Sequence, residues 1–71
     1  MEMGFNVIVE VDEDGYYVAS VPQLRGCHTQ ARSLDDLMER IREAIDLCVQ
    51  EQGPPVTSTQ FLGIQRVTVQ L

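Results

Sequence analysis

The sequence predicts an α+β domain with a three-stranded antiparallel meander, one long amphipathic helix packed on the sheet, and a C-terminal fourth strand, in the order β-β-β-α-β. Three observations predict it: alternating apolar residues near both ends of the chain, an Asp-Gly turn, and a central stretch with apolar residues at three- and four-residue spacing. We expect residues 1–71 to form a single domain. A monomer of this size buries only about 60% of the surface of its unfolded chain, so self-association is expected.

The first three strands follow from the N-terminal half of the chain. Apolar residues occupy alternate positions over 5–11, the pattern of a half-buried strand. An acidic turn ending in Gly15 predicts a hairpin, because glycine accepts positive φ at little cost. Residues 16–21 return as the second strand, which Pro22 closes because it has no N–H for the ladder. A third strand is expected over 27–31.

The helix is predicted from its caps and its apolar face. Ser33 is a good N-cap, and acids in the first turn suit the helix dipole. Gly53, followed by two prolines, ends the helix after Gln52. Asp36 and Arg40 are spaced as an i,i+4 ion pair. The face expected to pack on the sheet consists of Leu34, Leu37, Met38, Ile41, Ala44, Ile45 and Cys48.

The fourth strand is expected at the C-terminus, after a Thr-Ser-Thr linker over residues 57–59. An apolar run begins at Phe61, and Val67, Val69 and Leu71 then alternate with polar residues. Gly63 is a candidate for a bulge in this strand.

Charge narrows the possible partners. The formal net charge is -6, and residues 1–24 hold five acids and no base. Phosphate contacts need lysine and arginine, so a broad nucleic-acid-binding surface is disfavoured and a basic protein partner is favoured. No apolar run reaches the length of a membrane span and the N-terminus has no signal-peptide pattern, so we expect a cytoplasmic protein without membrane contact.

Candidate chemistry is sparse. Cys27 and His28 are neighbours on an expected strand, so their side chains point to opposite faces and form no nucleophile-base pair. Cys27 and Cys48 are better interpreted as buried thiols than as a disulfide framework. We therefore expect no enzyme, no metal site and no cofactor. Arg25, His28 and Arg32 form one locally basic cluster, which is either solvated loop charge or a contact for a small anion or RNA phosphate.

The junction between the second strand and the helix carries a family resemblance. An Asp-Glu-Asp-Gly turn, then Val21-Pro22-x-Leu24-x-Gly26-Cys27-x-Thr29 and a capped acidic helix, resembles the HicB-like antitoxin domain over residues 5–51. The resemblance implies a degraded ribonuclease H-like fold. It also implies inhibition of HicA, a small basic toxin ribonuclease, by covering its active site. Arg25 and Ala31 stand where family members often have Pro and Gly.

Two functional hypotheses follow from this resemblance. The first is a non-enzymatic antitoxin that binds and occludes a HicA-type toxin. The alternative is a standalone structural or regulatory domain that forms homo-oligomers through an exposed edge strand and has no toxin partner. Many family members continue into a DNA-binding domain that this sequence does not show, so direct DNA binding is not expected. The candidate partner-binding residues are Glu13, Asp14, Asp36, Glu39, Glu43, Arg25, His28 and Arg32.

Overall fold

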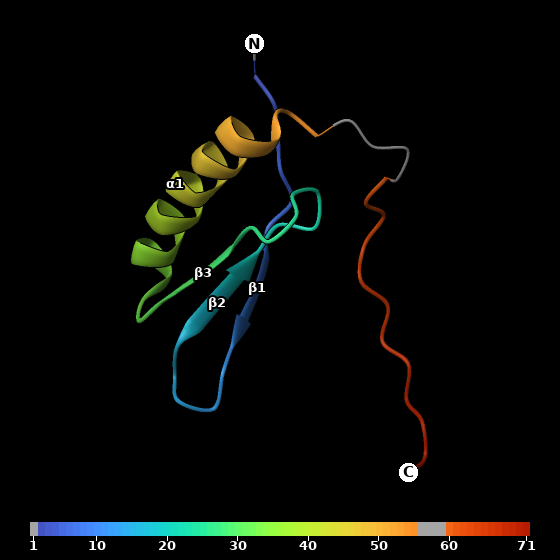
Figure 1. The fold of residues 1–71 in the computed structure, drawn as a ribbon. Helices are drawn as coiled ribbons and strands as arrows, with labels where there is room; N and C mark the ends of the chain where they lie inside the picture. Colours follow the sequence, from blue (N-terminus) through green and yellow to red (C-terminus); the bar gives the residue numbers. More distant parts are fainter. Residues whose placement is uncertain (1, 56–59) are drawn as a thin grey trace.

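A computed structural model describes residues 2–55 and 60–71 of the chain. Within them it contains three strands, β1 (Ile8–Val11), β2 (Tyr17–Ser20) and β3 (His28–Ala31), followed by helix α1 (Leu34–Gln52). The strands form an antiparallel sheet in the order β1-β2-β3, with the helix on one face (Figure 1). The predicted α+β class, the meander and the long helix are confirmed. Each strand is shorter than its apolar pattern indicated.

The register of the sheet decides which side chains face the helix. Val9 and Thr29 flank Ala19, and Val11 and Ala31 flank Tyr17. Residues opposite each other in an antiparallel pair lie on the same face. Ala19 and Ala31 are buried on this face, so it is the side on which the helix packs.

The β1–β2 hairpin is held by one side chain in addition to its backbone. The Asp12 carboxylate accepts hydrogen bonds from the backbone N–H groups of Asp14 and Tyr16, both at 2.9 Å. Gly15 has φ of 86°, the left-handed conformation that the Asp-Gly pattern predicts. The Asp12 side chain therefore stabilises the turn, and the side chains of Glu13 and Asp14 at its tip do not take part in these hydrogen bonds.

The loop between β2 and β3 folds into the core. Val21, Leu24 and Cys27 are all buried, and backbone hydrogen bonds link Val21 N–H to the Cys27 carbonyl and Leu24 N–H to the Val21 carbonyl. Gly26 has φ of 67°, which allows the chain to reverse before β3. The loop that contains Pro22, Leu24, Gly26 and Cys27 is thus hydrogen-bonded within itself and contributes buried side chains to the core.

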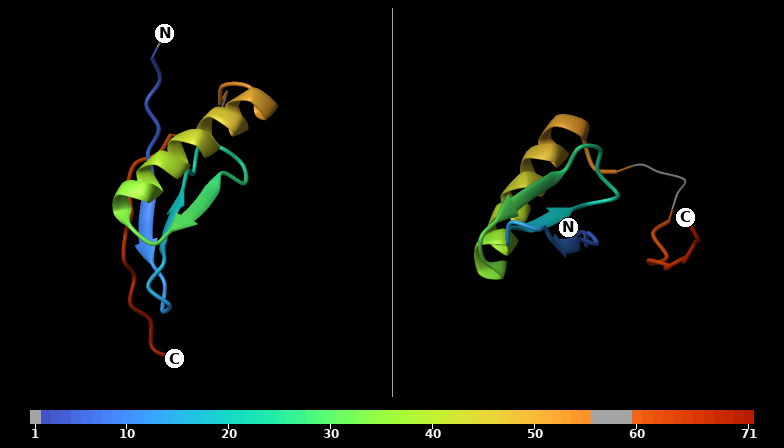
Figure 2. Two further views of the ribbon diagram at one scale, coloured as in Figure 1. Left: turned by 90° about the vertical axis from the view of Figure 1, so that its left-hand side faces the viewer. Right: turned by 90° about the horizontal axis from the view of Figure 1, so that it is seen from below.

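Helix α1 begins and ends where the sequence predicts. The Ser33 hydroxyl accepts a hydrogen bond from the Asp36 backbone N–H at 3.1 Å, and Gly53, with φ of 81°, donates its N–H to the Val49 carbonyl. The helix packs on β3 and β2 (Figure 2). The buried core consists of Ala19, Val21, Leu24, Cys27, Ala31, Leu37 and Ile41.

The apolar face of the helix is covered only in part. Leu34 and Met38, expected in the core, are 50% and 43% exposed. Because α1 packs on β3 and β2, the helix-facing side of β1 also stays open, and Val9 and Val11 are 42% and 62% exposed. The predicted helix face therefore packs on the sheet at Leu37, Ile41, Ala44, Ile45 and Cys48, and the prediction was wrong for Leu34 and Met38.

Among the residues that the structure describes, the expected fourth strand is not seen. Residues 60–71 run as an extended segment that pairs with no other strand, so Gly63 is not part of a bulge. This segment lies apart from the sheet (Figures 1 and 2). Alternation of apolar residues specifies a strand but not its partner, and within the described chain no partner is reached. The predicted linker over 57–59 lies outside the described residues.

Candidate functional site

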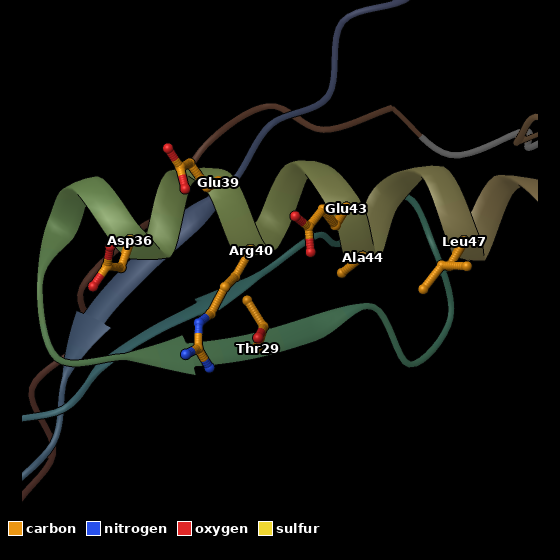
Figure 3. Close-up of a pocket in the computed structure, with 7 residues that line it drawn as sticks. All are labelled: Thr29, Asp36, Glu39, Arg40, Glu43, Ala44 and Leu47. Atoms are coloured by element: carbon orange, nitrogen blue, oxygen red, sulfur yellow. The ribbon is translucent and has the colours of Figure 1, made fainter.

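An open groove runs along the exposed side of α1 beside β3. It has a volume of about 570 Å³, and Figure 3 shows its lining residues. Three of the predicted partner-binding acids, Asp36, Glu39 and Glu43, lie here because positions three and four apart share one side of a helix. The remaining lining residues are Thr29, Arg40, Ala44 and Leu47.

Arg40 is turned toward the sheet. Its Nη1 donates a hydrogen bond to the Gln30 carbonyl oxygen at 3.5 Å, so the guanidinium lies over the outer edge of β3 (Figure 3). The sequence instead predicted an ion pair between Arg40 and Asp36. The Gln30 carbonyl faces outward from an edge strand and needs a donor, which explains the orientation of Arg40.

The acids of the groove are directed outward. Asp36, Glu39 and Glu43 are all exposed, and the Glu39 side chain projects away from the sheet, opposite to Arg40 (Figure 3). Exposed carboxylates without a committed donor can accept hydrogen bonds from arginine or lysine of another molecule. The groove thus offers an acidic rim over a floor that contains Ala44 and Leu47.

The hairpin tip supplies two more acids at the same end of the molecule as the helix start. Glu13 and Asp14 are exposed in the turn, while Asp12 holds the backbone. The β2–β3 register pairs Tyr17 with Ala31, two residues before the N-cap Ser33, so the tip and the first turn of α1 lie at one end of the sheet. The acids predicted from sequence therefore extend from the tip to the side of the helix.

The predicted basic cluster is not assembled. Arg25 precedes β3 and Arg32 follows it, so the two lie beyond opposite ends of a strand that spans roughly 13 Å at 3.3 Å per residue. His28 is exposed at the start of the strand. An extended strand carries sequence neighbours apart, and this is why proximity in sequence was misleading here.

Arg32 and Arg25 each take part in an internal contact. Arg32 Nη2 donates to the Tyr16 hydroxyl at 2.9 Å, and its guanidinium carbon lies 4.8 Å from the centre of the Tyr16 ring. The Gln52 side chain accepts from the Arg25 N–H at 3.2 Å and donates to the Arg25 carbonyl at 2.6 Å. The Arg32 side chain thus links the end of β3 to the β1–β2 hairpin, and the Gln52 side chain links the β2–β3 loop to the end of α1.

Sequence reasoning missed the Asp12 and Gln52 contacts. An aspartate at the start of a turn is a known signal for a side chain that bonds the backbone two residues on, so the role of Asp12 was recoverable. The contact of Gln52 with Arg25 joins residues that are far apart in sequence, so no local sequence pattern predicts it.

The two cysteines belong to the interior. Cys27 is buried in the core and Cys48 packs beside it, as predicted, and both are free thiols. Burial raises the pKa of the Cys27 thiol from 9.0 to about 11, helped by a hydrogen bond with Cys48 and by charge repulsion from it. A thiol that is protonated at neutral pH is a poor nucleophile, which agrees with a structural role.

Neither a metal site nor a membrane span is present within residues 2–55 and 60–71. These residues contain no group of three or more His, Cys, Asp or Glu side chains placed to hold a metal ion. Their helix is also too polar to cross a membrane.

Comparisons with known proteins point to one family. A protein-family model described as HicB_like antitoxin of bacterial toxin-antitoxin system matches residues 5–64. A UPF0150 protein of Archaeoglobus fulgidus is 55% identical over 67 residues, covering 94% of this chain and 96% of that protein. A UPF0150 protein of Synechocystis sp. is 49% identical over 65 residues, covering 92% and 93% of the two chains. A third, from Thermotoga maritima, is 30% identical over 67 residues, covering 93% and 89%.

Proposed function

The chain belongs to the HicB-like antitoxin family, and from that premise we propose that it is a non-enzymatic antitoxin that binds a small basic toxin ribonuclease of the HicA type and occludes its active site. The observation that carries this proposal is the acidic rim of the α1 groove. Asp36, Glu39 and Glu43 are exposed there while Arg40 is engaged with β3.

Charge supports the same mode of binding. The chain has a net charge of -6, and the rim and the hairpin tip lie on exposed elements that leave room for a partner. Complementary charges accelerate encounter and orient the partner, while apolar contacts at the centre of an interface supply much of the affinity. Ala44 and Leu47, which is 60% exposed, offer apolar surface beside the acids.

The proposed mechanism is steric and electrostatic. The antitoxin places carboxylates where the toxin would hold RNA phosphates, and RNA is excluded from the covered surface. This role needs no cofactor, no metal and no catalytic group of the antitoxin itself. It takes place in the cytoplasm, and the β1-β2-β3-α1 order is compatible with the degraded ribonuclease H-like fold that the family implies.

The test is isothermal titration of the chain with a small basic toxin encoded by the adjacent gene. We expect saturable binding that weakens as salt is raised, together with loss of the toxin's RNA cleavage. Absence of binding at low salt would contradict the proposal.

Paired variants locate the interface. The double change Glu39→Gln with Glu43→Gln is expected to weaken binding, because both carboxylates lie on the rim. The matched control is Asp46→Asn with Glu51→Gln, which removes the same charge from the same helix outside this groove. Equal loss of affinity in the two double variants would show that net charge, rather than the rim, governs binding.

A further inference from the structure

The chain exposes far more surface than a compact protein of its mass. Its accessible surface is 6267 Å² for 8.0 kDa, whereas folded monomers of that mass expose about 4,450 Å². Its radius of gyration is 13.8 Å, against about 11 Å for a compact chain of this length. The excess, about 1,800 Å², exceeds the roughly 800 Å² that each partner buries in a standard protein interface.

Much of the excess comes from residues 60–71, which we call the C-terminal arm. The arm is extended and unpaired, and its large apolar side chains from Leu62 onward are at least 70% exposed. From Val67 onward it follows the alternation of a strand with one apolar face. Free peptide groups and an apolar face are the two features of a strand that lacks its sheet. The exposed residues are Leu62, Ile64, Val67, Val69 and Leu71.

The sheet has one edge suited to receive such a strand. At the edge formed by β3, Arg40 lies against the Gln30 carbonyl and obstructs an incoming chain. At the other edge, β1 pairs with β2 alone within the described residues, and Val9 and Val11 leave apolar surface on the helix side.

An apolar groove continues this open surface. It has a volume of about 380 Å³ and lies between α1 and the segment that leads into β1, with Met3, Phe5 and Met38 among its lining residues. A fourth strand beside β1 would extend the sheet beneath this side of the helix. It would cover the part of the apolar helix face that stays open in a single chain.

The arm and the β1 edge match in both polarity and charge. With Val67, Val69 and Leu71 on the helix side, beside Val9 and Val11, the opposite side of the arm carries Arg66. The same side of β1 carries Glu10, since side chains alternate along a strand. Arg66 is the one charged side chain of the arm, and Glu10 would be a neighbour of opposite charge on the same side of β1.

We propose that the C-terminal arm of one copy adds as a fourth strand to the β1 edge of a second copy, so that two chains complete each other's sheets. Within one chain the arm lies apart from β1 and stays exposed. Every copy carries both the arm and the edge, so the exchange is self-complementary, as a two-fold dimer requires. This inference does not depend on the antitoxin role.

The test is light scattering of the full chain over a dilution series, with substitutions in the arm. The wild type is expected to have at least twice the 8.0 kDa mass of one chain at high concentration. Val69→Lys puts a charge on the apolar face of the arm and is expected to weaken association roughly 100-fold or more, since two buried valines are lost per dimer. Gln70→Lys, one residue further on the opposite face, is expected to associate as the wild type does.

A mixture of two variants, one with a damaged arm and one with a damaged β1 edge, distinguishes the exchange of arms from association through another surface. Val11→Lys damages the receiving edge at a residue that is already 62% exposed, and circular dichroism checks that the helix is retained. Each defective chain alone is expected to be monomeric, and an equimolar mixture of Val11→Lys and Val69→Lys to recover a dimer through its one intact arm and edge. A monomeric wild type at every concentration, including one whose arm folds onto its own sheet, would overturn the proposal. So would equal masses for all the variants.

Discussion

Cys27 shows at the scale of one residue how burial sets chemistry. Its pKa is raised from 9.0 to about 11, mainly because the buried thiolate is poorly solvated. The folded chain keeps this proton at a pH where the unfolded chain has released it. The associated stability is therefore fully present below pH 9 and is lost as the pH rises toward 11.

The difference in free energy of unfolding between the wild type and Cys27→Ala is expected to shrink as the pH rises from 9 to 11, because only the wild type must ionise the buried Cys27 thiol. Urea unfolding of both proteins at several pH values measures this difference, in which the pH dependence common to the two proteins cancels. A difference that stays constant over this range would mean that the Cys27 pKa is not raised.

The N-cap residue Ser33 contributes to the stability of helix α1. The Ser33 hydroxyl binds the Asp36 N–H, which otherwise has no acceptor within the helix. Ser33→Ala is expected to lower the free energy of unfolding by about 1 kcal/mol, or about 4–8 °C in Tm for a domain of this size. Ser33→Asp keeps an acceptor at the cap and serves as the control. Equal losses in the two variants would show that the cap does not stabilise the helix.

The helix was predictable from sequence to its final residue because its signals are local. Ser33 and Gly53 set the two ends, and the spacing of Asp36, Glu39 and Glu43 placed them on one side of the helix. The fourth strand was not predictable in the same way. Alternation indicated that residues 61–71 are suited to a sheet, but which edge they join depends on partners that a local pattern does not encode.

The site was predictable to a similar extent. Acids that share a helix side were brought together, since the helical period fixes their relative positions. The basic residues were separated, because Arg25 and Arg32 flank an extended strand. The direction of Arg40 toward Gln30 depends on tertiary placement of α1 over β3, which no pair spacing reveals.

The proposed toxin-binding surface and the proposed dimer surface lie in different regions of the molecule. Acids occupy the hairpin tip and the open side of α1, whereas the arm carries apolar side chains and a single arginine. A basic partner would be attracted to the first region. The β1 edge lies away from the β3 side of the helix, so a completed dimer would leave the acidic groove accessible. The two proposed interactions are therefore compatible in one assembly.

Removal of residues 60–71 deletes the arm and leaves every buried core residue in place, so the shortened chain can test what the arm contributes to stability. The Tm of the full chain is expected to rise with protein concentration, since association stabilises the folded state by mass action. The Tm of the shortened chain is expected to be independent of concentration and to converge with that of the full chain on dilution. Thermal unfolding followed by circular dichroism over a concentration series measures both. A Tm difference that persists at high dilution would instead mean that the arm stabilises its own chain.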